Sequence, residues 1–190
     1  MKLINDHIYL SPTDLSQHLA CRHLTTLNRL CEQDEINRPQ LDDPGLEVLR
    51  EKGLSHESAY LDHLRLDGLM VVLMNESQLD MKATLEAMKG GAGAISQAWL
   101  EYGRWRGCAD VLLRVPGKSR LGDYHYIVVD TKLSTNTKAG TILQLCVYTD
   151  LISNLQGRRP DTMRVVTPGT HFLPEIYRVD HFEAYYLEVK

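Results

Sequence analysis

Apolar residues recur at helical spacing through the first third of the chain. Ser11, Pro12 and Asp14 form a helix-start signal: serine caps a helix, proline suits its first position, and an acid three residues after the cap completes a capping box. The helical pattern then continues without a break to residue 35. These features predict one long N-terminal helix.

Two further helices are predicted before the pattern changes. Asp43 and Pro44 repeat the same start signal, and the pattern after them indicates a helix to residue 68. Ser77 is predicted to cap a third helix that ends on the glycines at 90–91. Between these two helices, the apolar run 70–74 is typical of a short buried strand.

The second half of the chain is rich in strand formers. Segments 94–103, 105–115 and 124–133 contain many β-branched and aromatic residues, and segment 116–123 has turn chemistry. We therefore expect an antiparallel meander of three strands. A helix opening at Lys138 and stopping at Gly157 follows, then a strand over 163–169.

A last helix, capped by Asp180, is expected to reach the end of the sequence. The order of elements predicts an α/β fold with a mixed central sheet flanked by helices, plus an N-terminal helical cap. We divide the chain into a helical region over 1–70 and a core over 71–190, which together form a single compact domain.

Composition narrows the class of protein. The 190 residues are 43% hydrophobic and carry a net charge of −4, which is ordinary for a globular domain and does not favour coating nucleic acid by bulk charge. No apolar run reaches the roughly 18 residues of a membrane span, and the N-terminus lacks the apolar region of an export signal. We therefore expect a cytoplasmic protein with no membrane partner.

The strongest candidate chemistry involves Asp110, Asp130 and Lys132. Asp130 and Lys132 follow a buried apolar run and, two residues apart on a strand, point to the same face. Asp110 lies on the neighbouring strand of the predicted meander. Two carboxylates and a lysine at one sheet edge suit Mg²⁺ or Mn²⁺, which prefer oxygen ligands and activate water for attack on a phosphate.

The helix after this strand carries a second signal. Gln144 and Tyr148 are four residues apart, so they share one face of a largely apolar helix. Buried polar groups need partners, and a site at the adjacent strand end would supply them.

Three motifs in this order resemble the RecB-like nucleases of the PD-(D/E)xK superfamily, which include CRISPR-associated exonucleases. The motifs are Gly107 to Asp110, Val128 to Lys132, and Gln144 to Tyr148. Segments 10–27 and 130–152 are similar to the nuclease domain that precedes a superfamily 1 helicase in long bacterial proteins. The resemblance covers nearly the whole chain and implies a restriction-endonuclease-like core.

The resemblance also implies roles for individual residues. Asp110, Asp130 and the Thr131 carbonyl would hold the metal, Lys132 would be the catalytic lysine, and Gln144 and Tyr148 would contact DNA or order the site. The family adds a histidine ligand from a helical G-x-x-x-H motif. In Gly53-Leu54-Ser55-His56-Glu57 the histidine comes one residue early and Glu57 falls at the motif spacing, so both His56 and Glu57 stay open as the ligand.

The cysteine positions differ from those of the nucleases that this chain resembles. Many of those nucleases hold an iron–sulfur cluster through one early and three late cysteines. Cys21 matches the early position, but no cysteine follows Cys146. A four-thiolate cluster is therefore not expected in this chain. The missing cysteines suggest a protein truncated at the C-terminus, with a helicase domain or subunit as a partner.

Two functions follow from these features. The first is a metal-dependent DNA nuclease, an exonuclease on single-stranded ends in repair, recombination or defence. The second is a non-catalytic nucleic-acid or partner-binding domain that keeps the nuclease fold and needs a helicase or a missing C-terminal region. A duplex-specific endonuclease is a further alternative, for which the sequence offers no reader helix.

Basic and aromatic residues are the remaining candidates for DNA contacts. Trp99, Tyr102 and Trp105 are close enough in sequence to stack bases of a single strand, although at least one of the two tryptophans is expected in the core. Arg104 and Arg106 precede Asp110 in the sequence, and six further basic residues are expected to flank the same sheet edge as the carboxylates. They are Lys118, Arg120, Lys138, Arg158, Arg159 and Arg164.

Overall fold

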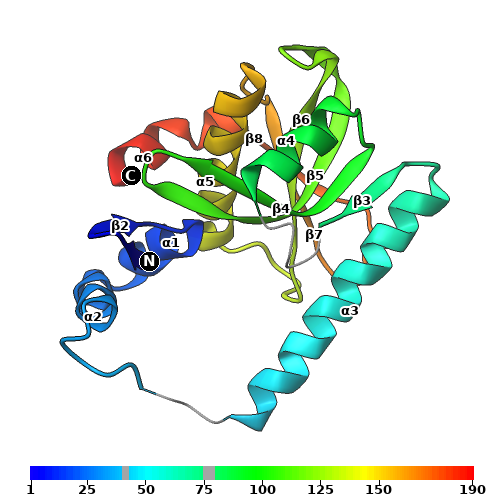
Figure 1. The fold of residues 1–190 in the computed structure, drawn as a ribbon. Coiled ribbons are helices and arrows are strands. Elements are labelled where there is room, and N and C mark those ends of the chain that lie inside the picture. Colours follow the sequence, from blue (N-terminus) through cyan, green and yellow to red (C-terminus); the bar gives the residue numbers. More distant parts are fainter. Residues whose placement is uncertain (40–42, 75–79) are drawn as a thin grey trace.

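The computed structural model describes residues 1–39, 43–74 and 80–190. Its main feature is a six-stranded mixed sheet in the order β3-β4-β5-β6-β7-β8, with helices on both faces (Figure 1). The elements are β1 (Lys2–Ile4), β2 (His7–Tyr9), α1 (Pro12–Ala20), α2 (Arg22–Glu32), α3 (Pro44–Leu66), β3 (Val71–Leu73), α4 (Met81–Lys89), β4 (Ala94–Tyr102), β5 (Trp105–Ser119), β6 (Gly122–Thr131), α5 (Ala139–Gln156), β7 (Thr162–Val166), β8 (Glu175–Arg178), a 3-10 helix (Val179–His181) and α6 (Glu183–Val189). The expected mixed α/β architecture is confirmed.

The strands of the sheet are connected by local hairpins and by two crossovers, one through α4 and one through α5. β4, β5 and β6 pair antiparallel in sequence order, as the meander prediction requires. β7 pairs parallel with β6 after the crossover helix α5, and β3 pairs parallel with β4. The predicted turn over 116–123 is too long: β5 continues to Ser119, which pairs with Gly122 at the start of β6.

Two hydrophobic cores lie on opposite faces of the sheet. The first collects buried residues of α1, α4, α5 and α6 against one face, around Leu112 and Val128. The second packs Tyr60, Leu61 and Leu64 of α3 against the other face. In Figure 1, α3 lies across the sheet with its C-terminal half, and its N-terminal half extends away from the sheet. Alternate residues of β5 and β6 therefore face different cores.

Two helices begin where their capping signals predict, but the predicted N-terminal helix is interrupted. α1 begins at Pro12 and α3 at Pro44, where the Asp43 carboxylate accepts a hydrogen bond from the Gly45 N–H at 2.9 Å, as predicted. The single long N-terminal helix is wrong: Cys21 is extended, with φ of −157° and ψ of 104°, and separates α1 from α2. Neither Gly nor Pro marks this break, so the sequence pattern gave no signal for it.

Two predicted helix caps need correction or comment, and one hairpin was missed. Ser77, the predicted cap of the third helix, lies outside the described residues, and the described helix α4 is capped by Asp80 through a 2.6 Å hydrogen bond from the Ala83 N–H. Asp180 does not cap the last helix; it lies in the 3-10 helix and pairs with Arg178. The β1–β2 hairpin was not predicted, although its turn residues Asn5 and Asp6 suit left-handed conformations.

In the described segments, no helix is both long and apolar enough to cross a membrane.

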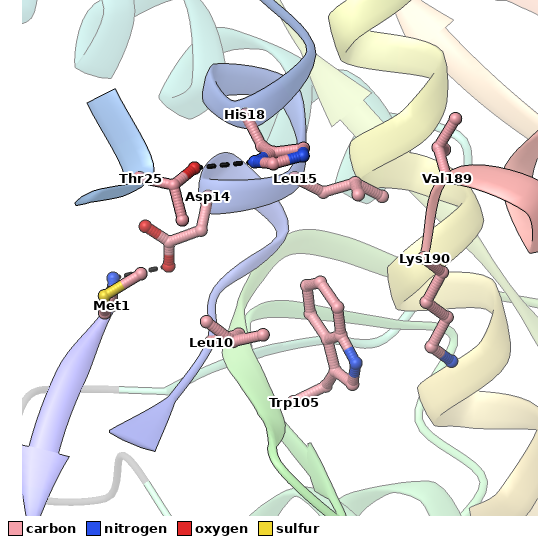
Figure 2. A pocket seen from close by; sticks show the side chains of 9 residues that line it. All are labelled: Met1, Leu10, Asp14, Leu15, His18, Thr25, Trp105, Val189 and Lys190. Carbon is pink, nitrogen blue, oxygen red and sulfur yellow. Dashed lines mark hydrogen bonds and ion pairs between the residues drawn. The ribbon is translucent and has the colours of Figure 1, made fainter. Parts of the chain in front are cut away.

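The Asp14 carboxylate connects the start of helix α1 to the N-terminal residue Met1. It accepts hydrogen bonds from the Ser11 N–H at 2.7 Å and from the Ser11 hydroxyl at 2.6 Å, and it pairs with the Met1 ammonium group (Figure 2). Burial raises its pKa, but the ammonium group and Ser11 outweigh burial and hold the pKa below its usual 3.8.

This balance predicts a specific acid response. A carboxyl group whose pKa is lowered on folding stabilises the fold at any pH above its pKa in the unfolded chain. That stabilisation is lost as the pH falls through its pKa in the folded protein. We expect Asp14→Asn to lower the melting temperature at pH 7, and the gap from the parent to close below about pH 4. Melting curves from pH 7 to pH 3 measure this gap; a constant gap at all pH values would contradict the assignment.

Candidate functional site

Asp110 and Asp130 meet where the pairing of β5 and β6 ends. The last matched positions of the two strands are Val111 and Val129, so Asp110 and Asp130 come next along the strands. On its other side Asp130 is opposite Val165 of β7, and it is only 5% exposed. The strands therefore bring two carboxyl groups, 20 residues apart in sequence, to one partly buried place.

Backbone and side-chain hydrogen bonds hold both carboxyl groups. Asp110 Oδ2 accepts from the Thr131 N–H at 2.9 Å and from the Thr131 hydroxyl at 3.1 Å. Lys132 Nζ donates to Asp130 Oδ1 at 3.0 Å and lies 2.9 Å from Oδ2. The structure thus brings together Asp110, Asp130, Thr131 and Lys132, four of the predicted site residues.

The electrostatics of this group are strongly coupled. Burial raises the pKa of Asp130, and the neighbouring Asp110 carboxylate raises it further, while Lys132 opposes both. Burial alone lowers the pKa of Lys132, but Asp130 and Asp110 outweigh burial and raise it above its usual value. Lys132 is therefore a cation at neutral pH, and an added positive charge would favour ionisation of Asp130.

His56 and Glu57 of α3 turn to different neighbours. Glu57 Oε1 accepts hydrogen bonds from Gln97 Nε2 at 2.6 Å and from the Ser96 hydroxyl at 3.4 Å. Burial raises its pKa, and the nearby Asp110 charge acts in the same direction. Glu57 thus lies within electrostatic range of the paired carboxylates.

His56 faces the end of β7 instead. Its Nε2 lies 3.4 Å from the Val166 carbonyl oxygen, and its ring stacks on Phe172 with centroids 5.9 Å apart. The Val166 carbonyl also accepts the Lys132 N–H at 3.0 Å, so His56 is next to the site but is directed at the β7 backbone. Neither side chain is hydrogen-bonded to Asp110 or Asp130 in the described structure, so His56 and Glu57 both stay open as the ligand.

Tyr148 and Gln144 share one face of α5 but have different partners. The Tyr148 hydroxyl donates to the Cys108 carbonyl at 2.6 Å, two residues before Asp110. Its pKa is raised by burial and by the charges of Asp110 and Asp130. Gln144 Nε2 donates to the Ser16 hydroxyl of α1 at 3.0 Å. Tyr148 therefore belongs to the site, and Gln144 joins α5 to the N-terminal helix.

Gly107 explains why a glycine precedes Asp110. A Cβ atom at this position would lie 2.9 Å from Pro12 Cδ, closer than real Cβ atoms approach, and 3.0 Å from the Tyr148 hydroxyl oxygen, which is tighter than most real Cβ contacts. The absence of a side chain lets α1 and α5 both pack against the start of β5.

We expect Gly107→Ala to destabilise the fold by about 1–3 kcal/mol, because the added methyl group overpacks this junction. The clash also pushes the Tyr148 hydroxyl from the Cys108 carbonyl. Urea unfolding measures the loss, and Gly53→Ala is the control, because Gly53 lies in helix α3 and a Cβ atom there would meet only Leu133 Cδ1 at an ordinary 3.9 Å. An equal, small effect of both substitutions would contradict the packing role of Gly107.

Gln97 is a site residue that the sequence analysis missed. It lies in β4 opposite Asp110, and besides donating to Glu57 it accepts a hydrogen bond from Cys108 Sγ at 3.2 Å. One signal was present: Ser96 and Gln97 are two consecutive polar residues inside a strand that is otherwise mostly apolar.

The carboxylate oxygens of Asp110 and Asp130 are suitable ligands for a hard divalent cation. Within 1–39, 43–74 and 80–190, no group of three or more His, Cys, Asp or Glu side chains lies close enough together to hold a metal ion as placed. Asp110 and Asp130 nevertheless bring two carboxylates together, and the buried Asp130 Oδ2 is paired with the Lys132 ammonium group at 2.9 Å but makes no well-oriented hydrogen bond within the described residues. Carboxylate oxygens in this arrangement are what Mg²⁺ and Mn²⁺ prefer.

The sequence pattern predicted that the basic residues flank the site, but not all of them do. Lys118 and Arg120 lie at the β5–β6 turn, and Arg158 donates to the Lys118 carbonyl. This turn is at the opposite end of β6 from Asp130, about 26 Å away at the usual rise of a strand. Arg164 is opposite Val129 of β6, one position before Asp130.

The aromatic residues that were candidates for base stacking lie in different environments. Tyr102 is 59% exposed at the end of β4, whereas Trp105 packs against the first core and lines the cavity of Figure 2. Arg106 lies over the Tyr9 ring at 4.1 Å from its centroid. Cys21, the candidate cluster ligand, is exposed as a free thiol between α1 and α2.

Comparisons with known proteins add little to this geometry. No family model matches the chain, and no curated protein matches it. A solved structure described as "Crystal structure of SSO0001" matches with 13% identity over 98% of this chain and 79% of that chain, at a TM-score of 0.36.

Proposed function

We propose that this protein is a metal-dependent deoxyribonuclease of the RecB-like type, with a restriction-endonuclease-like core formed by β4 to β7 and α5. The observation that carries the proposal is the contact of Asp110, Asp130 and Lys132 at the end of the β5–β6 pairing. The order of the three sequence motifs supports the same conclusion. The preference for single-stranded ends rests on the resemblance alone.

Asp110 and Asp130 would hold the cation, together with the Thr131 carbonyl and either Glu57 or His56. A bound Mg²⁺ or Mn²⁺ would supply an activated water and neutralise charge on the scissile phosphate. Thr131 keeps the Asp110 carboxylate in place through two hydrogen bonds. Asp130 is kept rigid by its burial between β5 and β7.

Lys132 acts as a fixed positive charge. Neighbouring carboxylates raise the pKa of Lys132 and keep it protonated. Its side chain is 33% exposed, so its ammonium group is able to donate hydrogen bonds to the attacking water or to a phosphate oxygen. Tyr148 orients the Gly107–Asp110 segment through the Cys108 carbonyl.

A cleavage assay tests the proposal. End-labelled single- and double-stranded DNA is incubated with the protein and Mn²⁺ or Mg²⁺, with chelator as a blank. We expect cleavage that needs metal, and a rate about 10²–10³ lower for Lys132→Ala, because one fixed charge at the reacting phosphate is lost. Lys118→Ala, at the far end of the sheet, is the matched control and should cleave like the parent.

Two outcomes contradict the proposal. Equal cleavage by the parent, Asp130→Ala and Lys132→Ala would show that the reaction occurs elsewhere. No cleavage by any protein, with DNA binding retained, would favour a non-catalytic binding domain that keeps the nuclease fold.

A further inference from the structure

Trp99 is a tryptophan that belongs to neither hydrophobic core of the described residues. It is half-buried in β4, between Ala98 and Leu100, which are fully buried in the core beneath α5. Successive side chains of a strand point to opposite faces, so Trp99 points to the face on which α3 packs. The core on that face gathers around Tyr60 and Val111 and does not include Trp99.

The strand register places Arg106 and Tyr9 on the same face. β4 and β5 pair antiparallel, with Trp99 opposite Cys108 and Glu101 opposite Arg106. Directly opposite residues of an antiparallel pair share a face, so Trp99 and Arg106 point to the same side of the sheet. The Arg106 guanidinium group lies over the Tyr9 ring, 4.1 Å from its centroid. We call Tyr9, Trp99 and Arg106 the aromatic–arginine face.

The neighbouring aromatic residues point to the other face. Leu10 forms a parallel bridge with Trp105, and both side chains line the cavity of Figure 2. Tyr102 is opposite Trp105, so it shares this second face. Of the three aromatic residues that the sequence suggested for base stacking, only Trp99 therefore belongs to the aromatic–arginine face.

The aromatic–arginine face borders the candidate site along one edge of β5. β6 pairs with this edge only as far as Val111, and further along it the Arg106 N–H donates to the Leu10 carbonyl at 2.9 Å. Asp110 lies between these two pairings. It is four residues from Arg106, about 13 Å at the usual rise of a strand. About four nucleotides span this distance at the rise of one DNA strand.

Arg106 has hydrogen-bonding capacity that the described residues do not use. Its side chain is half-buried, and its Nη2 atom has no hydrogen-bond partner among those residues. A phosphate oxygen is a strong acceptor for a guanidinium group. Aromatic rings stack on nucleobases of any sequence, and arginine adds cation–π contacts. A tryptophan, a tyrosine and an arginine beside a site for phosphate chemistry therefore suit a single nucleic-acid strand.

We propose that Tyr9, Trp99 and Arg106 form a platform that binds single-stranded DNA on its way to Asp110 and Asp130. Trp99 stacks on a base, and Arg106, held against the Tyr9 ring, binds a phosphate. A duplex fits this platform less well, because its bases are stacked on one another and do not offer their faces. The inference rests on the proposed nuclease function and adds the surface that holds the substrate.

DNA binding without catalysis tests the platform on the full chain. A fluorescein-labelled strand of about 20 thymidines is titrated, in chelator, with the parent, Trp99→Ala and Arg106→Ala, and anisotropy gives the Kd. Tyr102→Ala is the matched control for the tryptophan, because it removes an exposed aromatic ring from the same strand on the other face. Lys118→Ala, at the far end of the sheet, is the control for a lost positive charge.

We expect Trp99→Ala to bind about tenfold more weakly, and both control variants to bind within about twofold of the parent. Arg106→Ala should also lower the slope of log Kd against log salt concentration by about 0.7, because one phosphate contact is lost. Trp99→Ala should leave this slope unchanged. Trp99→Phe keeps an aromatic ring and should recover most of the affinity, which separates stacking from any effect of Trp99→Ala on folding.

The failures of the two proposals are distinguishable. Parent-like binding by Trp99→Ala and Arg106→Ala overturns the platform, and the cleavage assay still judges the nuclease proposal. An equal loss in Tyr102→Ala overturns the assignment of the face, and equally tight binding of a duplex of the same length overturns the preference for a single strand. Weaker binding by Trp99→Ala and Arg106→Ala, together with a parent that cleaves no DNA, supports the platform and overturns the nuclease.

Discussion

Asp130→Asn is expected to abolish metal-dependent cleavage without lowering the melting temperature. The substitution keeps the shape of the side chain but removes a charged oxygen ligand, so we expect a rate loss of about 10³-fold or more. The fold should tolerate it because Asp110, Asp130 and Glu57 place three acids around Lys132. Removing one buried carboxyl group leaves two acids beside the lysine and relieves desolvation and repulsion at Asp130.

Rates on end-labelled DNA with Mn²⁺, and melting curves of the same preparations, measure both effects. Asp123→Asn is the matched control, because Asp123 is exposed at the other end of β6. A fall in both stability and rate would mean that Asp130 serves the fold, and that the carboxylate contact is structural.

Gln156→Leu is expected to destabilise the fold by about 3 kcal/mol. Gln156 is fully buried at the end of α5, accepts from the Tyr126 N–H at 2.8 Å and donates to the Tyr126 carbonyl at 3.0 Å. β7 pairs with β6 only from Val129 onward, so this side chain takes the place of a strand beside Tyr126. Leucine would leave both buried backbone groups without partners, at about 1–3 kcal/mol each.

Urea unfolding of Gln156→Leu and of Asn154→Leu measures this effect. Asn154 lies on the exposed side of the same helix, and its replacement should change stability by less than about 0.5 kcal/mol. Gln156→Glu keeps the acceptor for the Tyr126 N–H but buries a carboxyl group against the carbonyl oxygens of Tyr126 and Arg158, so a loss at least as large is expected at pH 7. Equal midpoints for the leucine variants would contradict the role of Gln156.

Much of the candidate site was predictable because it is local in sequence. Asp130, Thr131 and Lys132 follow a run of buried β-branched residues, and such a run has one place where polar side chains emerge. Asp110 follows from the hairpin, since antiparallel strands joined by a turn have a definite register. Tyr148 follows from helical periodicity after this strand.

The parts that failed depend on contacts between distant segments. Gln144 and Tyr148 share a face by spacing, but docking of α1 gives Gln144 a partner in Ser16. The expected grouping of basic residues failed because β5 is longer than predicted and, with the turn to β6, carries Lys118 and Arg120 to the far end of the sheet. The break at Cys21 has no local signal at all.

By itself, the sequence determined the α/β class, the starts of α1, α3 and α5, and the neighbouring positions of Asp110, Asp130 and Lys132. Periodicity, caps and hairpin register are local properties, so they can be read within about 20 residues. The tertiary structure alone decided that Glu57 is hydrogen-bonded to β4 while His56 contacts β7. It also decided that Gln97 bridges Glu57 to Cys108. These contacts join α3 to a sheet about 40 residues later in the chain, and only the packing of that helix brings the side chains together.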